Sequence, residues 1–417
     1  MPTIAYIANE FPNAVEWYVA DEIRELRRRG IKVVPCSAVA ARAESVPENE
    51  RELWRETLPV RPFGGLLVLR AAVLCICKAR ILADLLSRVA WGGTEPLGRR
   101  IRALGHTLLG TVYALRLRGA GVDHIHAHHG FYASWIAMVA ARLLNIPFSL
   151  TLHGSDLLLH PAYLDVKLKH CAFCRTISEF NRRHILKSFP SVPAEKILVR
   201  QLGVDVPAAT LTELRDPSAE QPLKLLAVGR LHSVKNHQFL IRACYLLRAC
   251  GVRVQCLIVG DGPERPALQF LIAELQLCET VSLIGAVPRQ EIDCYYEMAD
   301  LVVLTSRSEG IPLVLMEAMA RARLVLAPAI TGISELVIEG KTGFLYQPED
   351  LEGFVWRVEQ IGRSLRALDG VRRGARERVR KHFERTDNLR RFVDAFVERL
   401  SEKKAVAASE NPVLQQI

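Results

Sequence analysis

The chain lacks several features that would assign it to a common class of protein. Among its 417 residues, no apolar run reaches the roughly 18 to 20 residues that a membrane-spanning helix needs. The first residues, MPTIAYIANE, carry no basic segment, so we expect no signal peptide and a cytoplasmic location. None of the sequence patterns of nucleic-acid-binding domains occurs, so no nucleic-acid partner is expected.

Close cysteine pairs and metal-binding patterns are also scarce. The ten cysteines are scattered, most of them inside apolar segments, as is usual for reduced, buried thiols. Cys171 and Cys174 form the one Cys-x-x-Cys pair, and no second such pair or suitably spaced histidine accompanies it, so we interpret it as packing. No Asp-x-Asp sequence occurs, so nothing offers a carboxylate clamp for a divalent metal.

The composition is that of an ordinary globular protein. Half of the residues are hydrophobic and 24% are charged, and the length is sufficient for two domains that each bury a core. The net charge of +10 predicts acidic ligands, such as nucleotide phosphates or anionic lipid headgroups. Expected strands and helices alternate through both halves, which predicts an α/β fold of two doubly wound, Rossmann-like domains.

One stretch, residues 306–320, reads SRSEGIPLVLMEAMA and joins an expected strand to an expected helix. The apolar run 301–304 before it is typical of a buried parallel strand. Glu309 and Gly310 make a turn, and Pro312 suits the first position of a helix. Free backbone N–H groups and the helix dipole at such a start favour an anion, for example a phosphate.

Two carboxylates, Glu309 and Glu317, flank this helix start at positions i and i+8. A carboxylate can accept hydrogen bonds from both hydroxyls of a vicinal diol, as a ribose or a hexose presents. A sugar nucleotide would therefore fit, with its diphosphate at the helix start. The alternative is a capped surface helix with Glu317 in solvent.

The wording EGIPLVLMEAM resembles the nucleotide-sugar motif of the retaining GT-B glycosyltransferases of family 4, most closely those of exopolysaccharide and colanic-acid-type biosynthesis. The resemblance implies two Rossmann-like domains that face each other across a cleft. It implies an acceptor-binding domain over residues 1–206, joined by a C-terminal helix at about 386–400, and a nucleotide-sugar-binding domain over 222–385. Residues 401–417 show no clear pattern, and we expect a disordered tail.

Further motifs of the same family follow in order. After an expected strand at 223–228 come Gly229-Arg230-Leu231 and Lys235-Asn236, which match the GRL…KN pattern. Two cations five residues apart at a strand end can converge on one diphosphate and stabilise a leaving nucleotide, although a solvated basic turn is the alternative. Gly260 lies in a VGDGPE loop that the family places near the nucleotide.

In the first half, residues 148–152 are an expected strand whose exit is His153-Gly154-Ser155-Asp156. In the family the matching histidine reaches the donor sugar, and we expect Asp156 to be a helix N-cap. The resemblance thus implies catalytic roles for His153, Arg230, Lys235 and Glu309. It implies donor-binding roles for Gly229, Gly260, Gly310, Ile311, Pro312, Leu313 and Glu317.

The loop at residues 9–16 lacks the paired glycines that many relatives carry there, and the usual Ser-Glu-Thr is Val15-Glu16-Trp17. Its role in donor binding is left open. The segment GVDHIHAHHG at 121–130 places His124, His126 and His128 on one face of an expected strand, so a zinc site has to be considered. The segment also resembles the HxH strand end of the family, and we expect no metal.

Between residues 61 and 119, ten Lys or Arg residues face only Asp84 and Glu95, interleaved with apolar runs. Two interpretations stay open: an interfacial anchor on an anionic membrane, or packed helices whose basic residues face water.

The function that the resemblance implies is the transfer of a hexose-type sugar from a nucleotide to a hydroxyl of a saccharide or lipid-linked saccharide, with retention of configuration, in cell-surface polysaccharide biosynthesis. No cofactor or metal is expected, and a UDP-sugar is favoured over a GDP-sugar as donor. A non-catalytic sugar-nucleotide-binding or scaffold protein with the GT-B fold remains the alternative. A sugar-nucleotide epimerase or a phosphorylase is a weaker one.

Overall fold

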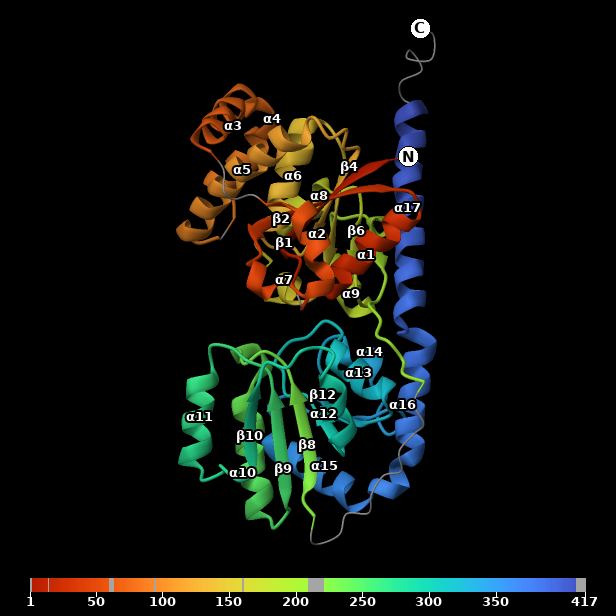
Figure 1. The fold of residues 1–417 in the computed structure, drawn as a ribbon. Coiled ribbons are helices and arrows are strands. Elements are labelled where there is room, and N and C mark those ends of the chain that lie inside the picture. Colours follow the sequence, from red (N-terminus) through yellow and green to blue (C-terminus); the bar gives the residue numbers. More distant parts are fainter. Residues whose placement is uncertain are drawn as a thin grey trace. The chain divides into compact units, whose positions relative to one another are not determined.

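We describe a computed structural model, which covers residues 2–13, 15–59, 64–93, 95–159, 161–208 and 221–409 in sufficient detail (Figure 1). The chain divides into two compact units: unit 1 comprises residues 1–200 and 389–417, and unit 2 comprises residues 201–388. Most of the expected linker, residues 209–220, lies outside the described residues.

Unit 1 is built on a seven-stranded sheet in the order β3-β2-β1-β4-β5-β6-β7, with every neighbouring pair parallel. Its strands are β1 (Thr3–Phe11), β2 (Lys32–Ala40), β3 (Leu58–Pro59), β4 (His124–His128), β5 (Phe148–Leu152), β6 (Cys174–Thr176) and β7 (Ile197–Val199). The strand order reverses between β1 and β4, as in doubly wound nucleotide-binding folds.

Unit 2 repeats this plan with a six-stranded sheet in the order β10-β9-β8-β11-β12-β13, also parallel throughout. Its strands are β8 (Leu223–Val228), β9 (Val254–Val259), β10 (Val281–Gly285), β11 (Leu301–Val303), β12 (Leu324–Pro328) and β13 (Phe344–Tyr346). Here the order reverses between β8 and β11. The predicted α/β class and the doubly wound topology are confirmed for both halves.

Helices cover both faces of each sheet (Figure 1). Those of unit 1 are α1 (Trp17–Arg28), α2 (Arg51–Glu56), α3 (Gly65–Cys77), α4 (Ala79–Ala90), α5 (Leu97–Leu117), α6 (Tyr132–Leu144), α7 (Ser155–Leu158), α8 (Leu164–His170) and α9 (Glu179–Ser188). Those of unit 2 are α10 (His237–Ala249), α11 (Arg265–Glu274), α12 (Ile292–Met298), α13 (Leu313–Ala320), α14 (Ile333–Leu336), α15 (Leu351–Arg363) and α16 (Asp369–His382). Helix α17 (Arg385–Ser409) follows.

The central strands sit in the core whether their sequence is apolar throughout, as in β12 (LVLAP), or alternates with polar residues, as in β4 (HIHAH) and β5 (FSLTL). All five residues of β4, β5 and β12 are buried, as expected for parallel strands covered by helices on both faces. Helix α6 buries an unbroken run, residues 133–141, against the sheet of unit 1. Phe392 and Phe396 of α17 pack with Ile4 and Tyr6 of β1, so this helix completes the core of unit 1.

Two local differences from the sequence analysis concern chain segments near the unit boundary. The last strand of unit 1 is β7, whereas residues 202–205, which resemble the strand that closes the first domain in family 4 enzymes, form only a single bridge, from Val204 to Glu384. Helix α17 continues to Ser409, past residue 401 where we expected the tail, and residues 410–417 lie outside the described residues. Across the described ranges, no helix is long and apolar enough to cross a membrane.

Candidate functional site

In unit 2, an ion pair sits where the strand order reverses. Lys235 comes from the short 3-10 turn after β8 (Ser233–Lys235), and Glu309 comes from the loop between β11 and α13. Lys235 Nζ donates to Glu309 Oε1 at 2.6 Å, and the two side chains are 18% and 12% exposed. Because β8 and β11 are neighbours, their carboxyl ends bring these residues together at the position where open α/β sheets bind ligands.

The glycine loops beside this pair are packed backbone against backbone. Gly260 has φ +140°, and a Cβ on it would lie 2.0 Å from the carbonyl oxygen of Gly229. The N–H of Leu231 donates to the carbonyl of Asp261 at 2.9 Å, which ties the two loops together. Only glycine fits at position 260, and the close packing leaves Arg230 exposed at the edge of the sheet.

The loop before α13 is held in place by the loop that follows β12. Thr331 Oγ1 donates to the carbonyl of Glu309 at 2.6 Å, and a Cβ on Gly332 would lie 2.2 Å from the carbonyl oxygen of Gly310. Helix α13 begins at Leu313, one residue later than predicted, so Pro312 is its N-cap rather than its first residue. The N–H groups of Leu315 and Met316 already donate to the carbonyl of Pro312, so those of Leu313 and Val314 are the ones available to an anion.

Glu317 is half-buried and hydrogen-bonded, whereas the surface-helix alternative places it in solvent. Its Oε2 accepts a hydrogen bond from the hydroxyl of the buried Tyr296 at 2.8 Å, and Arg321 stacks over the Tyr296 ring at 5.2 Å. Burial raises the pKa of Glu317 above its ordinary value. The carboxylate is therefore fixed in position by a residue of α12, with its second oxygen left for another donor.

Unit 1 carries its own cluster at the carboxyl ends of β4 and β5. The ring of His129 lies between two carboxylates: its Nε2 is 2.7 Å from Glu16 Oε1, and its Nδ1 is 3.5 Å from Asp156 Oδ2. Burial would lower the pKa of His129, but Asp156 and Glu16 raise it to about 10. His129 therefore carries a permanent positive charge at neutral pH.

His153 lies beside this cation, its ring centroid 4.5 Å from that of His129. Burial, and then the charges of His129 and His128, hold the pKa of His153 well below its ordinary value, so the ring is neutral. The carboxylate of Asp156 accepts the backbone N–H groups of Gly130, Gly154 and His153 at 2.8, 2.8 and 3.1 Å. It therefore braces the two strand ends, and the predicted N-cap role is wrong, because α7 begins at Ser155 with Gly154 as N-cap.

A buried network supports the cluster. Glu22 of α1 accepts hydrogen bonds from Tyr6 and Arg175, and His128 Nε2 lies 2.8 Å from its Oε2. Burial alone would raise the pKa of Glu22, but Arg175 and then His128 lower it from 4.5 to about 2. The network links α1, β1, β4 and β6 beneath His153.

The histidines of β4 share one face, as predicted, and their ring nitrogens are occupied by other side chains. Ser149 Oγ lies 2.7 Å from both His124 Nε2 and His126 Nδ1, and Thr151 Oγ1 lies 3.0 Å from His126 Nε2. Within the described ranges, no group of three or more His, Cys, Asp or Glu residues is arranged to hold a metal ion.

The site residues named from the sequence thus fall into two groups. Arg230, Lys235, Glu309, Glu317 and the glycine loops lie in unit 2, and His153 lies in unit 1. Sequence reasoning missed Glu16 and His129 as partners, and it missed the buried pair of Glu22 and Arg175. The run of four histidines could have indicated a role for His129, whereas nothing in the order of residues indicated that Glu22 and Arg175 pair.

Two family models match the chain in succession. The model described as Glycosyltransferase Family 4 matches residues 15–207, and the model described as Glycosyl transferases group 1 matches residues 213–378. The first coincides with most of unit 1 and the second with most of unit 2.

Among curated proteins, the putative colanic acid biosynthesis glycosyltransferase WcaL of Salmonella typhimurium is 35% identical over 198 residues, which is 46% of this chain and 48% of that protein. The amylovoran biosynthesis glycosyltransferase AmsK of Erwinia amylovora is 32% identical over 215 residues, 50% of this chain and 52% of that protein. The chain spans about half the length of the curated relatives that it matches.

Solved structures agree over nearly the whole chain. Sucrose-phosphate synthase from Thermosynechococcus elongatus has a TM-score of 0.74 at 16% identity and covers 96% of this chain and 100% of that one. HepE from Anabaena in complex with UDP-glucose has a TM-score of 0.69 at 18% identity and covers 95% and 100%. At these identities the likeness concerns the fold.

Two Rossmann-like units with polar clusters at their switch points, together with these likenesses, define a protein of the GT-B fold. The chain carries a Glycosyltransferase Family 4 domain followed by a Glycosyl transferases group 1 domain, and its fold is that of the GT-B glycosyltransferases.

Proposed function

We propose that the protein is a retaining, metal-independent glycosyltransferase of cell-surface polysaccharide biosynthesis. It transfers a sugar from a nucleotide-sugar donor to a hydroxyl of a saccharide or lipid-linked saccharide. We assign the acceptor to the domain of residues 1–206 and the donor to the domain of residues 222–385. WcaL and AmsK, which are named for colanic acid and amylovoran biosynthesis, support the pathway, and HepE, solved with UDP-glucose, supports a UDP-sugar.

The observation that carries the donor site is the ion pair of Lys235 and Glu309 beside the start of α13. Without a diphosphate, the ammonium of Lys235 is neutralised by Glu309. A bound diphosphate would take Lys235 as its counterion, together with Arg230 and the first N–H groups of α13, which frees the carboxylate of Glu309 to accept sugar hydroxyls. In the absence of donor, the ion pair therefore keeps both Lys235 and Glu309 in position for binding.

The remaining donor contacts follow from the same geometry. Glu317, fixed by Tyr296, presents its second oxygen to the ribose. The backbone of Gly229, Gly310, Ile311 and Leu313 and the cap residue Pro312 surround the phosphates, while Gly260 holds the loop under Gly229. In the transfer step, the bond between the anomeric carbon and the phosphate oxygen breaks. The acceptor oxygen bonds to the same face of that carbon, and the leaving phosphate takes the proton of the acceptor hydroxyl.

His153 is the catalytic group that we assign to unit 1. Because it is neutral, it can accept a hydrogen bond from a sugar hydroxyl, which a protonated ring could not do. Burial, and then the positive charge of His129, keep it in that state, so His129, Glu16 and Asp156 are positioning residues.

The release of nucleotide from a panel of UDP- and GDP-sugars tests this function. We expect release from at least one of these donors by the wild type, and a loss of ten-fold or more in Lys235→Ala, because a charge-assisted contact to the leaving group is removed. Lys341→Ala, an exposed lysine of the same unit, is the control and should keep full activity. Nucleotide binding without turnover of any donor would instead favour the non-catalytic sugar-nucleotide-binding alternative.

We also propose that unit 1 contacts an anionic membrane from the cytoplasmic side. Helix α3 exposes an apolar stripe at Leu66, Leu69, Val73 and Ile76, spaced as one helical face. Helix α5 exposes three more apolar side chains, and exposed arginine and lysine residues flank both helices. The exposed apolar side chains can insert into the membrane interface, and each basic residue near an anionic surface contributes about 1 kcal/mol. Together these two contributions favour an interfacial position.

Co-sedimentation with vesicles tests the membrane contact. The wild type should bind phosphatidylglycerol vesicles more than phosphatidylcholine vesicles, and the double variant Leu69→Glu with Ile76→Glu should lose that binding. Phe270→Glu introduces the same charge at a similarly exposed apolar residue of unit 2 and should leave binding intact. Equal sedimentation of the double variant would exclude this surface.

A further inference from the structure

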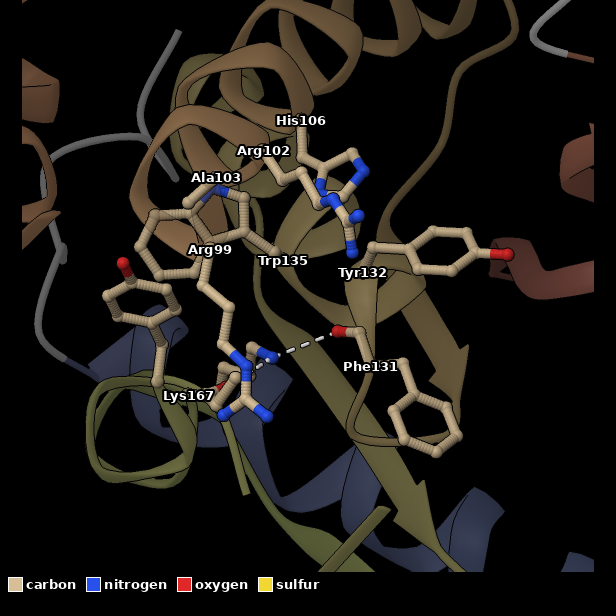
Figure 2. Close-up of a pocket in the computed structure, with 10 residues that line it drawn as sticks. Arg99, Arg102, Ala103, His106, Phe131, Tyr132, Trp135 and Lys167 are labelled. Atoms are coloured by element: carbon tan, nitrogen blue, oxygen red, sulfur yellow. Dashed lines mark hydrogen bonds between the residues drawn. The ribbon is translucent and has the colours of Figure 1, made fainter. Parts of the chain in front are cut away.

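Unit 1 contains a cavity of about 320 Å³ that none of the assignments above uses. It lies among helices α5, α6 and α8 and the loop that follows β4 (Figure 2). Its lining residues are Arg99, Arg102, Ala103, His106, Phe131, Tyr132, Trp135, Ala162, Tyr163 and Lys167. The composition is aromatic and cationic, and no carboxylate lines it.

Helical spacing explains how the basic wall forms. Arg99, Arg102 and His106 occupy positions i, i+3 and i+7 of α5, so all three lie on one face of that helix. Figure 2 shows Arg99 extending from α5 toward Lys167, whereas Arg102 and His106 point toward Tyr132. The rings of His106 and Tyr132 stack with centroids 5.1 Å apart, which fixes that side of the cavity.

The charges of this wall are not balanced locally. Among the described residues, neither Arg99 nor Arg102 forms an ion pair or a side-chain hydrogen bond. Lys167 is buried, and its Nζ donates to three backbone carbonyls, those of Gly130, Phe131 and Ala162, at 2.7, 2.9 and 3.0 Å. Burial, and then the charges of Lys167 and Arg102, lower the pKa of His106 to about 4, so its ring is neutral at neutral pH.

The opposite wall is aromatic. Tyr163 and Trp135 pack with ring centroids 4.9 Å apart, and Trp135 is fixed by a hydrogen bond from its Nε1 to Thr107 at 3.0 Å. Tyr163 is 4% exposed, yet its hydroxyl forms no hydrogen bond with any described residue. Its backbone has φ +53°, a conformation that costs free energy in a residue other than glycine and is often retained at ligand sites.

The cavity adjoins the cluster around His153 and His129. Phe131 and Tyr132, which line it, come two and three residues after His129. Lys167 holds the carbonyl of Gly130, while Asp156 holds the N–H of the same residue. The loop between the cavity and the cluster is therefore fixed from both sides, and the ring of Phe131, which lines the cavity, lies with its centroid 5.9 Å from that of His129.

We propose that this cavity binds an anionic group of the acceptor, with the guanidinium groups of Arg99 and Arg102 on the anion and the aromatic wall against a sugar ring. The inference rests on the proposed function, which places an acceptor in unit 1, and it adds the chemical class of that acceptor. Unpaired guanidinium groups bind carboxylates and phosphates in a bidentate manner, and a cavity with aromatic walls and a few polar groups is typical of small-molecule sites. The anion is the carboxylate of an acidic sugar or the diphosphate of a lipid-linked saccharide.

Saturation-transfer NMR and calorimetry on the full chain test the proposal with defined probes. The probes are methyl glucuronide for the carboxylate, geranyl diphosphate for the phosphate, and methyl glucoside as a neutral control. We expect one anionic probe to bind and the neutral sugar not to bind. The double variant Arg99→Gln with Arg102→Gln should weaken that binding at least ten-fold. Arg118→Gln, at the other end of α5, should not change it.

The outcomes distinguish the two sources of the anion, and they distinguish failure of the cavity proposal from failure of the proposed function. Binding of methyl glucuronide alone identifies an acidic sugar, and binding of geranyl diphosphate alone identifies a diphosphate carrier; both support the site. Equal binding of the neutral sugar, no binding of either anion, or binding unchanged in the double variant overturns it. UDP titrated into the same samples reports on unit 2, so a failed cavity with intact UDP binding leaves the proposed function standing.

Discussion

The buried pair of Glu22 and Arg175 gives the sharpest test of how unit 1 is held together. Both side chains are 2% exposed, so Arg175→Met leaves a buried carboxylate without its main counterion. Methionine keeps an apolar side chain against Phe392, over whose ring the guanidinium sits at 3.9 Å. Breaking one partner of a buried ion pair costs about 3 to 5 kcal/mol. The fall in the pKa of Glu22 from 4.5 to about 2 corresponds to about 3 kcal/mol, in agreement.

The sign of the pH dependence follows from that lowered pKa. A carboxyl group whose pKa is lower in the folded state contributes stability above its unfolded pKa of 4.5, and this is lost as the pH falls toward 2. In Arg175→Met, burial is no longer opposed by the guanidinium, so Glu22 becomes easier to protonate. The stability difference between wild type and variant should therefore be largest near pH 7 and should shrink toward pH 3.

Urea unfolding of unit 1, followed by tryptophan fluorescence and circular dichroism, measures both quantities. The double variant with Glu22→Gln should recover part of the loss, because the unpaired charge is gone. Arg28→Met, which removes a surface pair with Glu25 from a side chain that is 71% exposed, should change stability by about 0.5 kcal/mol or less. A cost below about 1 kcal/mol for Arg175→Met, or a difference that does not depend on pH, would refute the reasoning.

Two further perturbations follow from the same structure. Gly260→Ala forces a Cβ to 2.0 Å from a backbone carbonyl, so it should lower the melting temperature of unit 2. Gly251→Ala, with φ +77° but nothing within 4 Å, should cost only about 1 kcal/mol of backbone strain; equal melting temperatures would contradict this. The raised pKa of His129, about 10 against an ordinary 6.5, contributes stability below pH 6.5 that is lost as the pH rises to 10. His129→Gln should flatten that loss in alkaline unfolding curves, and an unchanged profile would show that His129 is not the titrating group.

How much of this was predictable differs between the two units. In unit 2 the strand at 223–228 and the glycine turn of the VGDGPE loop follow directly from the sequence, because largely apolar runs and tight turns are local signals. The partner of Lys235 does not follow. We expected Lys235 beside a diphosphate and Glu309 on a sugar, and their contact depends on β8 and β11 being neighbours, which only the three-dimensional strand order reveals.

In unit 1, several features could not be predicted from the sequence, for different reasons. Strand β7 has only three residues and lies at the edge of the sheet, so its signal was too short to recognise. The sequence analysis gave His129 no role; it follows β4 with φ +67° and turns its ring away from the strand histidines toward Glu16 and Asp156. Such a reversal depends on one backbone angle. Burial of Glu22 with Arg175, 153 residues apart, is a purely tertiary event.

Calorimetric titration of UDP and GDP, without added metal, tests the donor site most directly. We expect one nucleotide to bind to the wild type, and Lys235→Ala and Glu317→Gln each to weaken it ten-fold or more, because each removes a charge-assisted contact worth about 1.5 to 3 kcal/mol. Glutamine keeps an acceptor for Tyr296, and Lys341→Ala is the control. Binding that both variants weaken would place the nucleotide at the switch point of unit 2. Absence of binding by either nucleotide, or binding indifferent to both variants, would contradict the account.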